Sequence, residues 1–172
     1  LDIVDPNNIG LEGHSMGGGA VLAAALAHPD GYRSVVLEGS ATRTLFSPPG
    51  DAKFPRNLAV VFSKYDEFSQ LMWGVPRAID VTHSPKLLAL FDSEAPVVPG
   101  RLYGSLEAGS ARILYTPGTT HPGDHISPEA IGDSLEWFQR TLTGGSPRDR
   151  ADQIWWWKEI GTLIAFVGFV AV

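Results

Sequence analysis

The chain has 172 residues, of which 44% are hydrophobic, and this is enough for one globular domain with its own core. Acidic residues outnumber basic residues by 19 to 13, and no lysine or arginine cluster alternates with aromatic residues, so we expect no nucleic-acid partner. The absence of cysteine excludes thiol catalysis, disulfide bonds and cysteine-ligated zinc, and it leaves the compartment open.

Short apolar runs alternate with segments that favour helix. Residues 9–12 predict a strand that ends at Gly13, and residues 16–28 predict a helix that stops at the following Pro29-Asp30-Gly31. Continuous apolar or β-branched runs predict three further strands, at 34–37, 57–62 and 111–116. The alternation predicts an α/β fold with a mostly parallel sheet and flanking helices.

Two helices carry clear start signals. Ser84-Pro85 precedes an apolar run, and Ser127-Pro128 opens an amphipathic segment, each with a capping serine and a proline in the first turn. The stretch 67–110 is too long for a simple crossover and predicts a small insertion over the site. Met72 and Trp73 in this stretch could line a substrate pocket or pack in the core.

The two ends of the chain carry different signals. Residues 144–153 begin with Gly144-Gly145-Ser146-Pro147 and predict a linker after a domain at 1–143. Residues 154–172 contain three tryptophans, one Lys-Glu pair and an apolar run from Ile160, which is typical of an aromatic belt leading into a transmembrane helix. A buried terminal helix of a soluble fold is the alternative.

The surroundings of this apolar run predict where the domain lies. Arg148, Arg150 and Lys158 precede it, which predicts a membrane-associated protein whose domain faces the cytoplasm. The chain opens at Leu1 without a methionine, so we also expect a preceding part of the protein.

Gly13-His14-Ser15-Met16-Gly17 fits the pattern G-x-S-x-G between a predicted strand and a predicted helix. A sharp strand-to-helix turn would raise the Ser15 hydroxyl above the sheet edge, and we expect glycine at 13 and 17 because side chains there would clash. The N–H of Met16 would then point to the place where an oxyanion forms, at the positive end of the helix. This context predicts a nucleophilic serine.

The glycine run has three other interpretations. No lysine follows it, as a phosphate-binding loop requires, and the last small position of a dinucleotide fingerprint is missed. A tight glycine turn with an incidental serine is the remaining alternative.

A nucleophilic serine needs a base and an orienting acid. Asp66 follows the third predicted strand and His121 follows the fourth, which gives the chain order serine, acid, histidine. Glu38 is the alternative acid and His125 the alternative base, and we expect Glu67 to face solvent.

No metal or cofactor is predicted. His121 and His125 are four residues apart, but Pro122 and Gly123 between them disfavour a helical ligand face, and no H-E-x-x-H occurs. His14, His28 and His83 fit packing or surface positions, although His14 flanks the predicted nucleophile.

With these residues in place, the chain resembles the C-terminal half of the α/β-hydrolase superfamily, in its dienelactone hydrolase and cutinase-like polyester hydrolase branch. The resemblance rests on "GHSMGGG" and on "PGTTHPGDHISPEAIGDSLEWF", and it covers about residues 5–143. It favours His121 as the base, and it implies that the first strands and the second oxyanion donor lie outside this chain. The long 67–110 stretch and the apolar end depart from the secreted esterases of this branch.

These observations predict a serine hydrolase of carboxylic esters or thioesters, including lipid esters, with Ser15 as nucleophile, His121 as base, Asp66 as acid and the Met16 N–H in the oxyanion hole. Two alternatives stay open. One is a hydrolase-like binding module of a membrane protein without catalysis. The other is a peptidase or acyltransferase that uses the same machinery.

Overall fold

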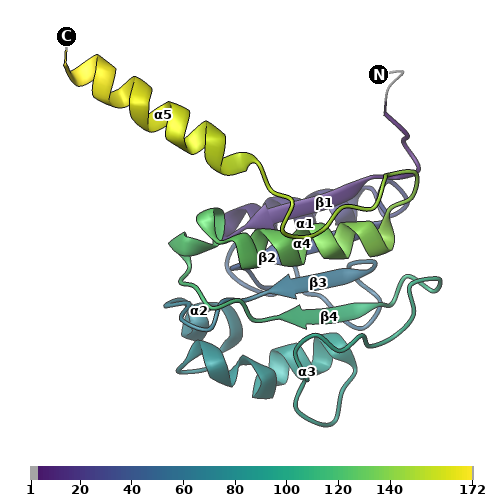
Figure 1. The fold of residues 1–172 in the computed structure, drawn as a ribbon. Coiled ribbons are helices and arrows are strands. Elements are labelled where there is room, and N and C mark those ends of the chain that lie inside the picture. The colour runs from purple at the N-terminus through teal and green to yellow at the C-terminus, as the bar shows by residue number, and fades with distance from the viewer. Residues whose placement is uncertain (1–3, 172) are drawn as a thin grey trace.

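The computed structural model describes residues 4–171, and its centre is a four-stranded parallel sheet (Figure 1). The strands are β1 (Gly10–His14), β2 (Ser34–Glu38), β3 (Leu58–Val61) and β4 (Arg112–Tyr115). They lie side by side in chain order, and every neighbouring pair is parallel. The predicted α/β class with a parallel sheet is confirmed.

Within the described residues, five α-helices and two short 3₁₀ helices connect or follow the strands. They are α1 (Met16–Ala27), α2 (Ser69–Trp73), η1 (Ala78–His83), α3 (Pro85–Phe91), η2 (Pro122–Ile126), α4 (Pro128–Thr141) and α5 (Trp155–Val170). The predicted caps are present: the hydroxyl of Ser84 accepts from Leu87 N–H, and that of Ser127 accepts from Ala130 N–H.

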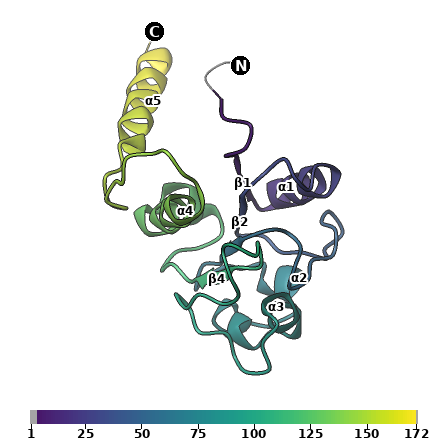
Figure 2. The same ribbon diagram turned by 90° about the vertical axis from the view of Figure 1, so that its right-hand side faces the viewer.

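Helices cover both faces of the sheet (Figure 2). Successive strand residues point to opposite faces, so Val35 and Leu37 pack with α1, α2 and α3, whereas Val36 packs with α4. All strand residues of β2, β3 and β4 are buried. This burial on both faces explains why apolar residues occupy consecutive positions in these strands, as in residues 35–37 and 58–61, rather than every second position.

The stretch 67–110 forms α2, η1 and α3, and most of its apolar side chains extend the core on the α1 side. Trp73 and Leu90 are almost fully buried there. The prediction of an insertion over the site therefore holds only for the start of the stretch, where α2 approaches the carboxyl ends of the strands.

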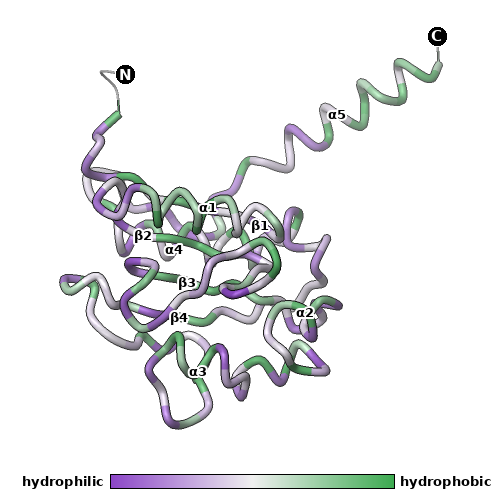
Figure 3. Tube along the Cα trace, turned by 180° about the vertical axis from the view of Figure 1, so that it is seen from behind, coloured by the Kyte–Doolittle hydropathy of each residue, from purple (hydrophilic) through white to green (hydrophobic). Residues whose placement is uncertain are grey.

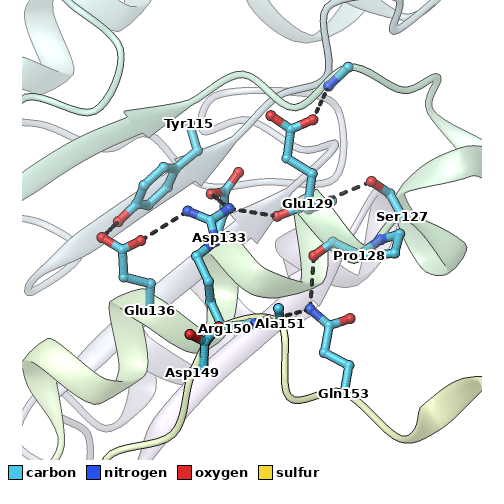
Figure 4. Close-up of polar contacts among 12 residues, drawn as sticks. Tyr115, Ser127, Pro128, Glu129, Asp133, Glu136, Asp149, Arg150, Ala151 and Gln153 are labelled. Carbon is cyan, nitrogen blue, oxygen red and sulfur yellow. Dashed lines mark hydrogen bonds and ion pairs between the residues drawn. The ribbon is translucent and has the colours of Figure 1, made fainter.

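The segment after α4 is tied to that helix by a network around Arg150 (Figure 4). The Arg150 guanidinium lies 2.6 Å from Asp133 Oδ1 and 3.0 Å from Glu136 Oε2, and it also donates to the Glu129 carbonyl. Gln153 donates to the Pro128 carbonyl at 2.8 Å. The predicted linker thus contacts α4 as far as Gln153, two residues before α5.

Beyond this network, α5 leads away from the domain (Figure 1), and its surface is largely apolar (Figure 3). None of its residues is buried, and the Trp156 and Trp157 rings stack at 4.0 Å. The sequence predicts the start of a transmembrane helix here. Among residues 4–171, however, no helix has both the length and the apolar character needed to cross a membrane.

Replacing Arg150 with Met should lower the free energy of unfolding by about 1–3 kcal/mol at pH 8, because it leaves the buried Asp133 carboxylate without its partner. Burial raises the pKa of Asp133 to about 6 even with Arg150 opposite, so the loss should shrink at pH 5, where the carboxyl takes up a proton. Chemical denaturation at both pH values measures this.

Arg148→Met is the matched control. The Arg148 side chain is exposed and lies 3.7 Å from an exposed carboxylate, so its loss should change stability by less than about 0.5 kcal/mol. Equal effects of the two substitutions would contradict the role assigned to Arg150.

Candidate active site

Ser15 stands at the turn between β1 and α1 in a strained backbone conformation, with φ 54° and ψ −122°. Gly13 is required for this turn, because a Cβ there would lie 2.4 Å from the Gly17 carbonyl oxygen. The same expectation for Gly17 is wrong: a Cβ at Gly17 would meet no atom within 4 Å. Of these two glycines, only Gly13 is needed to avoid a steric clash at the turn.

The side chains of Ser15, His121 and Asp66 form a continuous hydrogen-bonded chain. His121 Nε2 lies 2.9 Å from Ser15 Oγ, and His121 Nδ1 lies 2.9 Å from Asp66 Oδ2. The other oxygen of Asp66 accepts the Phe68 N–H at 2.8 Å. Three loops that follow β1, β3 and β4 therefore bring together the three residues selected from the sequence.

These contacts determine where the protons lie. A carboxylate accepts, so His121 carries its proton on Nδ1 and leaves the Nε2 lone pair to accept the Ser15 hydroxyl proton. Burial raises the pKa of Asp66, and the hydrogen bonds from His121 and Phe68 oppose this rise. The Phe68 ring packs edge-on against the imidazole of His121, with centroids 4.7 Å apart. This arrangement can transfer a proton from a serine nucleophile to a base.

Backbone contacts hold the loop of His121 against the loop of Asp66. Lys64 N–H donates to the Pro117 carbonyl, and Tyr65 N–H donates to the Thr119 carbonyl. Glu67 is exposed as expected, but its carboxylate also accepts the His121 N–H at 3.1 Å. The sequence contains no signal for this contact beyond the position of Glu67 next to Asp66.

The two alternative residues lie nearby but make different contacts. Glu38 ends β2 opposite His14, and its buried Oε1 has no hydrogen-bond partner among residues 4–171. Burial, together with the nearby carboxyls of Glu12 and Asp124, raises the pKa of Glu38 to about 7. The ring of His125 packs against His14 at 4.0 Å, and Ser15 bonds to His121 instead.

The backbone around the serine could hold a developing negative charge. Met16 begins α1, so its N–H has no carbonyl one turn earlier to bond. Ser40, which the sequence reasoning missed, donates its hydroxyl to the Ser15 carbonyl at 2.8 Å and so supports the turn. Its position in a loop directly after β2 was the available signal.

A cavity of about 360 Å³ opens beside Ser15 and His121. Apolar side chains make up most of its wall, and its lining residues are Ser15, Met16, Ser40, Thr44, Leu45, Phe46, Ser47, Phe68, Leu71, Met72 and His121. Of the two residues considered for a pocket, Met72 lines this cavity and Trp73 packs in the core. A larger hollow of about 530 Å³ lies between α4 and the segment after it and holds no histidine.

One cluster of possible metal ligands includes His121. The donor atoms of His14, His121 and Asp124 all lie within 4.8 Å of one another. Both ring nitrogens of His121 already face other partners, Asp66 and Ser15, so a metal bound by this cluster would have to displace one of them. In this arrangement His121 therefore contacts Asp66 and Ser15 through its two ring nitrogens.

Comparison of the chain with models of known protein families, with curated proteins and with solved structures finds no match. The geometry of the site is therefore the basis for the function proposed below.

Replacing Glu38 with Gln should stabilise the protein at pH 8 by about 1–3 kcal/mol and leave its stability at pH 5 nearly unchanged. The folded state holds the Glu38 proton up to about pH 7, whereas an unfolded glutamate loses it near pH 4.5. The stability from the neutral carboxyl is thus full below pH 4.5 and is lost as the pH rises towards 7. Chemical denaturation across this range tests the difference.

Glu94→Gln serves as the control, because Glu94 is exposed and its replacement should have the same small effect at both pH values. If Glu38→Gln changes stability equally at pH 5 and pH 8, the carboxyl of Glu38 does not titrate in this range.

Proposed function

We propose that this protein is a serine hydrolase that cleaves carboxylic esters or thioesters through an acyl-enzyme intermediate. The observation that carries the proposal is the chain of two 2.9 Å contacts from Ser15 Oγ through His121 to Asp66. A nucleophile, a base and an orienting acid in this order are the parts that acyl transfer requires.

In the proposed mechanism, Ser15 Oγ attacks the acyl carbon while His121 Nε2 takes the hydroxyl proton. Asp66 stabilises the imidazolium through Nδ1–H, and the Met16 N–H donates to the oxyanion. As the tetrahedral intermediate collapses, His121 returns the proton to the departing alcohol or thiol. Water then attacks the acyl-enzyme with His121 again as base, which releases the acid and restores Ser15.

The cavity supports a substrate with an apolar acyl group. Its volume of about 360 Å³ falls in the range of small-molecule sites, and its apolar side chains contribute most of the lining. Leu71 and Met72 from α2 and Phe46 from the loop after β2 all line this space. The polar groups lie where the ester bond would be, beside Ser15 and His121.

We also propose that the chain belongs to the α/β-hydrolase superfamily. The parallel sheet, the strained serine between β1 and α1, an acid after β3 and a histidine after β4 support this placement. Since a fold alone does not establish an activity, the proposed activity rests on the contacts of Ser15, His121 and Asp66 and not on the superfamily.

A lipid surface is the partner that we propose for α5. Its apolar residues are exposed around the helix, and from Ile160 on it has no charged residue. A helix segment of this kind is stable when surrounded by apolar material. Trp156 and Trp157 lie at its domain end, where aromatic residues favour the membrane interface. Arg148, Arg150 and Lys158 on the same side support a domain on the cytoplasmic side.

Ser15→Ala should abolish hydrolysis of p-nitrophenyl butyrate, with kcat/KM at least about 10³-fold lower, because no other group replaces the nucleophile. Release of p-nitrophenol measures the rate, and Ser146→Ala, in the exposed segment after α4, should behave as wild type. Retained hydrolysis in Ser15→Ala would contradict the mechanism. A folded wild type without activity on esters or thioesters would favour a binding module without catalysis.

Leu163→Glu should reduce binding of the protein to phosphatidylcholine vesicles about 10- to 100-fold, because a carboxylate in the apolar surface of α5 is costly to transfer into lipid. Co-sedimentation measures the bound fraction. Leu26→Glu is the matched control, since Leu26 is an exposed leucine on α1. If wild type does not sediment with vesicles, or if both substitutions act alike, α5 is not the lipid contact.

A further inference from the structure

The imidazole of His14, the residue before Ser15, faces the loop of His121. Its Nε2 lies 3.1 Å from the His121 carbonyl oxygen, and the two rings lie 4.6 Å apart. A carbonyl oxygen only accepts hydrogen bonds, so His14 must carry a proton on Nε2. This bond joins the end of the first strand to the loop that follows the last strand.

A second buried carboxylate lies behind this contact. Asp124 is fully buried, and its Oδ1 accepts the hydroxyl proton of Ser63, which follows β3. Its Oδ2 has no hydrogen-bond partner among the described residues and lies 3.6 Å from His14 Nε2. A buried carboxylate oxygen without a donor is costly, so Asp124 favours the orientation of the His14 ring that places Nε2–H 3.6 Å from its Oδ2.

The charge of His14 agrees with this arrangement. Burial opposes a charged imidazole, but the contacts with Asp124 and the His121 carbonyl, together with the charges of Glu38 and Asp124, raise the pKa of His14 above its usual value. His14 and Asp124 are thus a second neighbouring imidazole and carboxylate, 3.6 Å apart, whereas His121 and Asp66 lie 2.9 Å apart.

The side chains of His14, His121 and Asp124 pack against the backbone of Gly39. A Cβ on Gly39 would lie 2.9 Å from His121 Nδ1 and 3.0 Å from both His14 Nε2 and Asp124 Oδ2. The three atoms thus converge on one point, and a side chain at that point would push them apart. Gly39 also has φ +50°, which favours glycine.

We propose that His14 is a positioning residue. Asp124 holds the His14 side chain, and His14 in turn fixes the backbone of His121, so that His121 Nε2 stays within reach of Ser15 Oγ. The inference rests on the proposed hydrolase function. His14 does not line the cavity and acts through His121. Because His14 and Ser15 are adjacent in the chain, the same strand end carries the nucleophile and holds the loop of the base. A displacement of the base by about 1 Å can cost about 10²-fold in rate.

The test compares three variants with wild type in p-nitrophenyl butyrate hydrolysis. His14→Leu removes the N–H donor, His14→Gln keeps an N–H donor at a similar reach, and His125→Leu is the matched control. His125 packs on His14 at 4.0 Å, but its side chain makes no hydrogen bond among the described residues. Thermal unfolding confirms that each variant is folded.

We expect His14→Leu to lower kcat about 10- to 100-fold with KM changed less than about threefold, since substrate binding does not involve His14. His14→Gln should recover most of kcat, and His125→Leu should match wild type. The low-field proton resonance of His121 Nδ1–H, which reports the bond to Asp66, should shift or vanish in His14→Leu and persist in His14→Gln.

Wild-type kcat in folded His14→Leu would overturn the proposal, and so would an equal loss of kcat in His14→Gln. If His14→Leu does not fold, Asp124→Asn is tested in its place, because it removes the charge that holds His14. Asp124→Asn should lower kcat at least about fivefold, and an unchanged kcat would overturn the proposal. If wild type hydrolyses no ester, the proposed function fails, and the His121 resonance in wild type and His14→Leu still decides whether His14 positions His121.

Discussion

The parallel pairing of the four strands is the constraint on which the site depends. Because every strand runs in the same direction, the loops that carry Ser15, Asp66 and His121 leave the sheet at one edge. Ser15 and His121 are 106 residues apart in the chain, and Ser15 Oγ lies 2.9 Å from His121 Nε2 at this edge. Helices on both faces bury the strands, so the edge is held by the whole core and the three side chains need little adjustment to meet.

The same edge collects polar groups that are costly to bury. Asp66, Asp124 and Glu38 are all buried, and two of them carry an oxygen without a hydrogen-bond partner in the described part of the chain. Burial raises the pKa of Glu38 to about 7, which lowers the stability of the folded state at alkaline pH. Strain at Ser15 adds to this cost. A loss of stability at one edge of a well-packed core is typical of functional sites in proteins.

The sequence was sufficient for the main elements and for the three residues that meet at the edge. Strands buried on both faces leave long apolar runs, and the caps at Ser84 and Ser127 follow from local chemistry, so these features can be predicted without tertiary information. The contacts of Glu67, Ser40 and His14 could not be predicted, because they depend on how loops distant in the chain approach one another. The expected need for glycine at 17 was wrong for the same reason: the space around a Cβ is a property of the folded backbone.

The proposed mechanism requires an activated serine at position 15, and covalent labelling detects such a residue. We would treat the folded protein with a fluorophosphonate and identify the modified residue by mass spectrometry of its peptides. We expect a single label on Ser15, because only this hydroxyl has a histidine base and an acid behind it among the residues described. A folded protein that stays unlabelled, or that carries its label on another serine, would contradict the account.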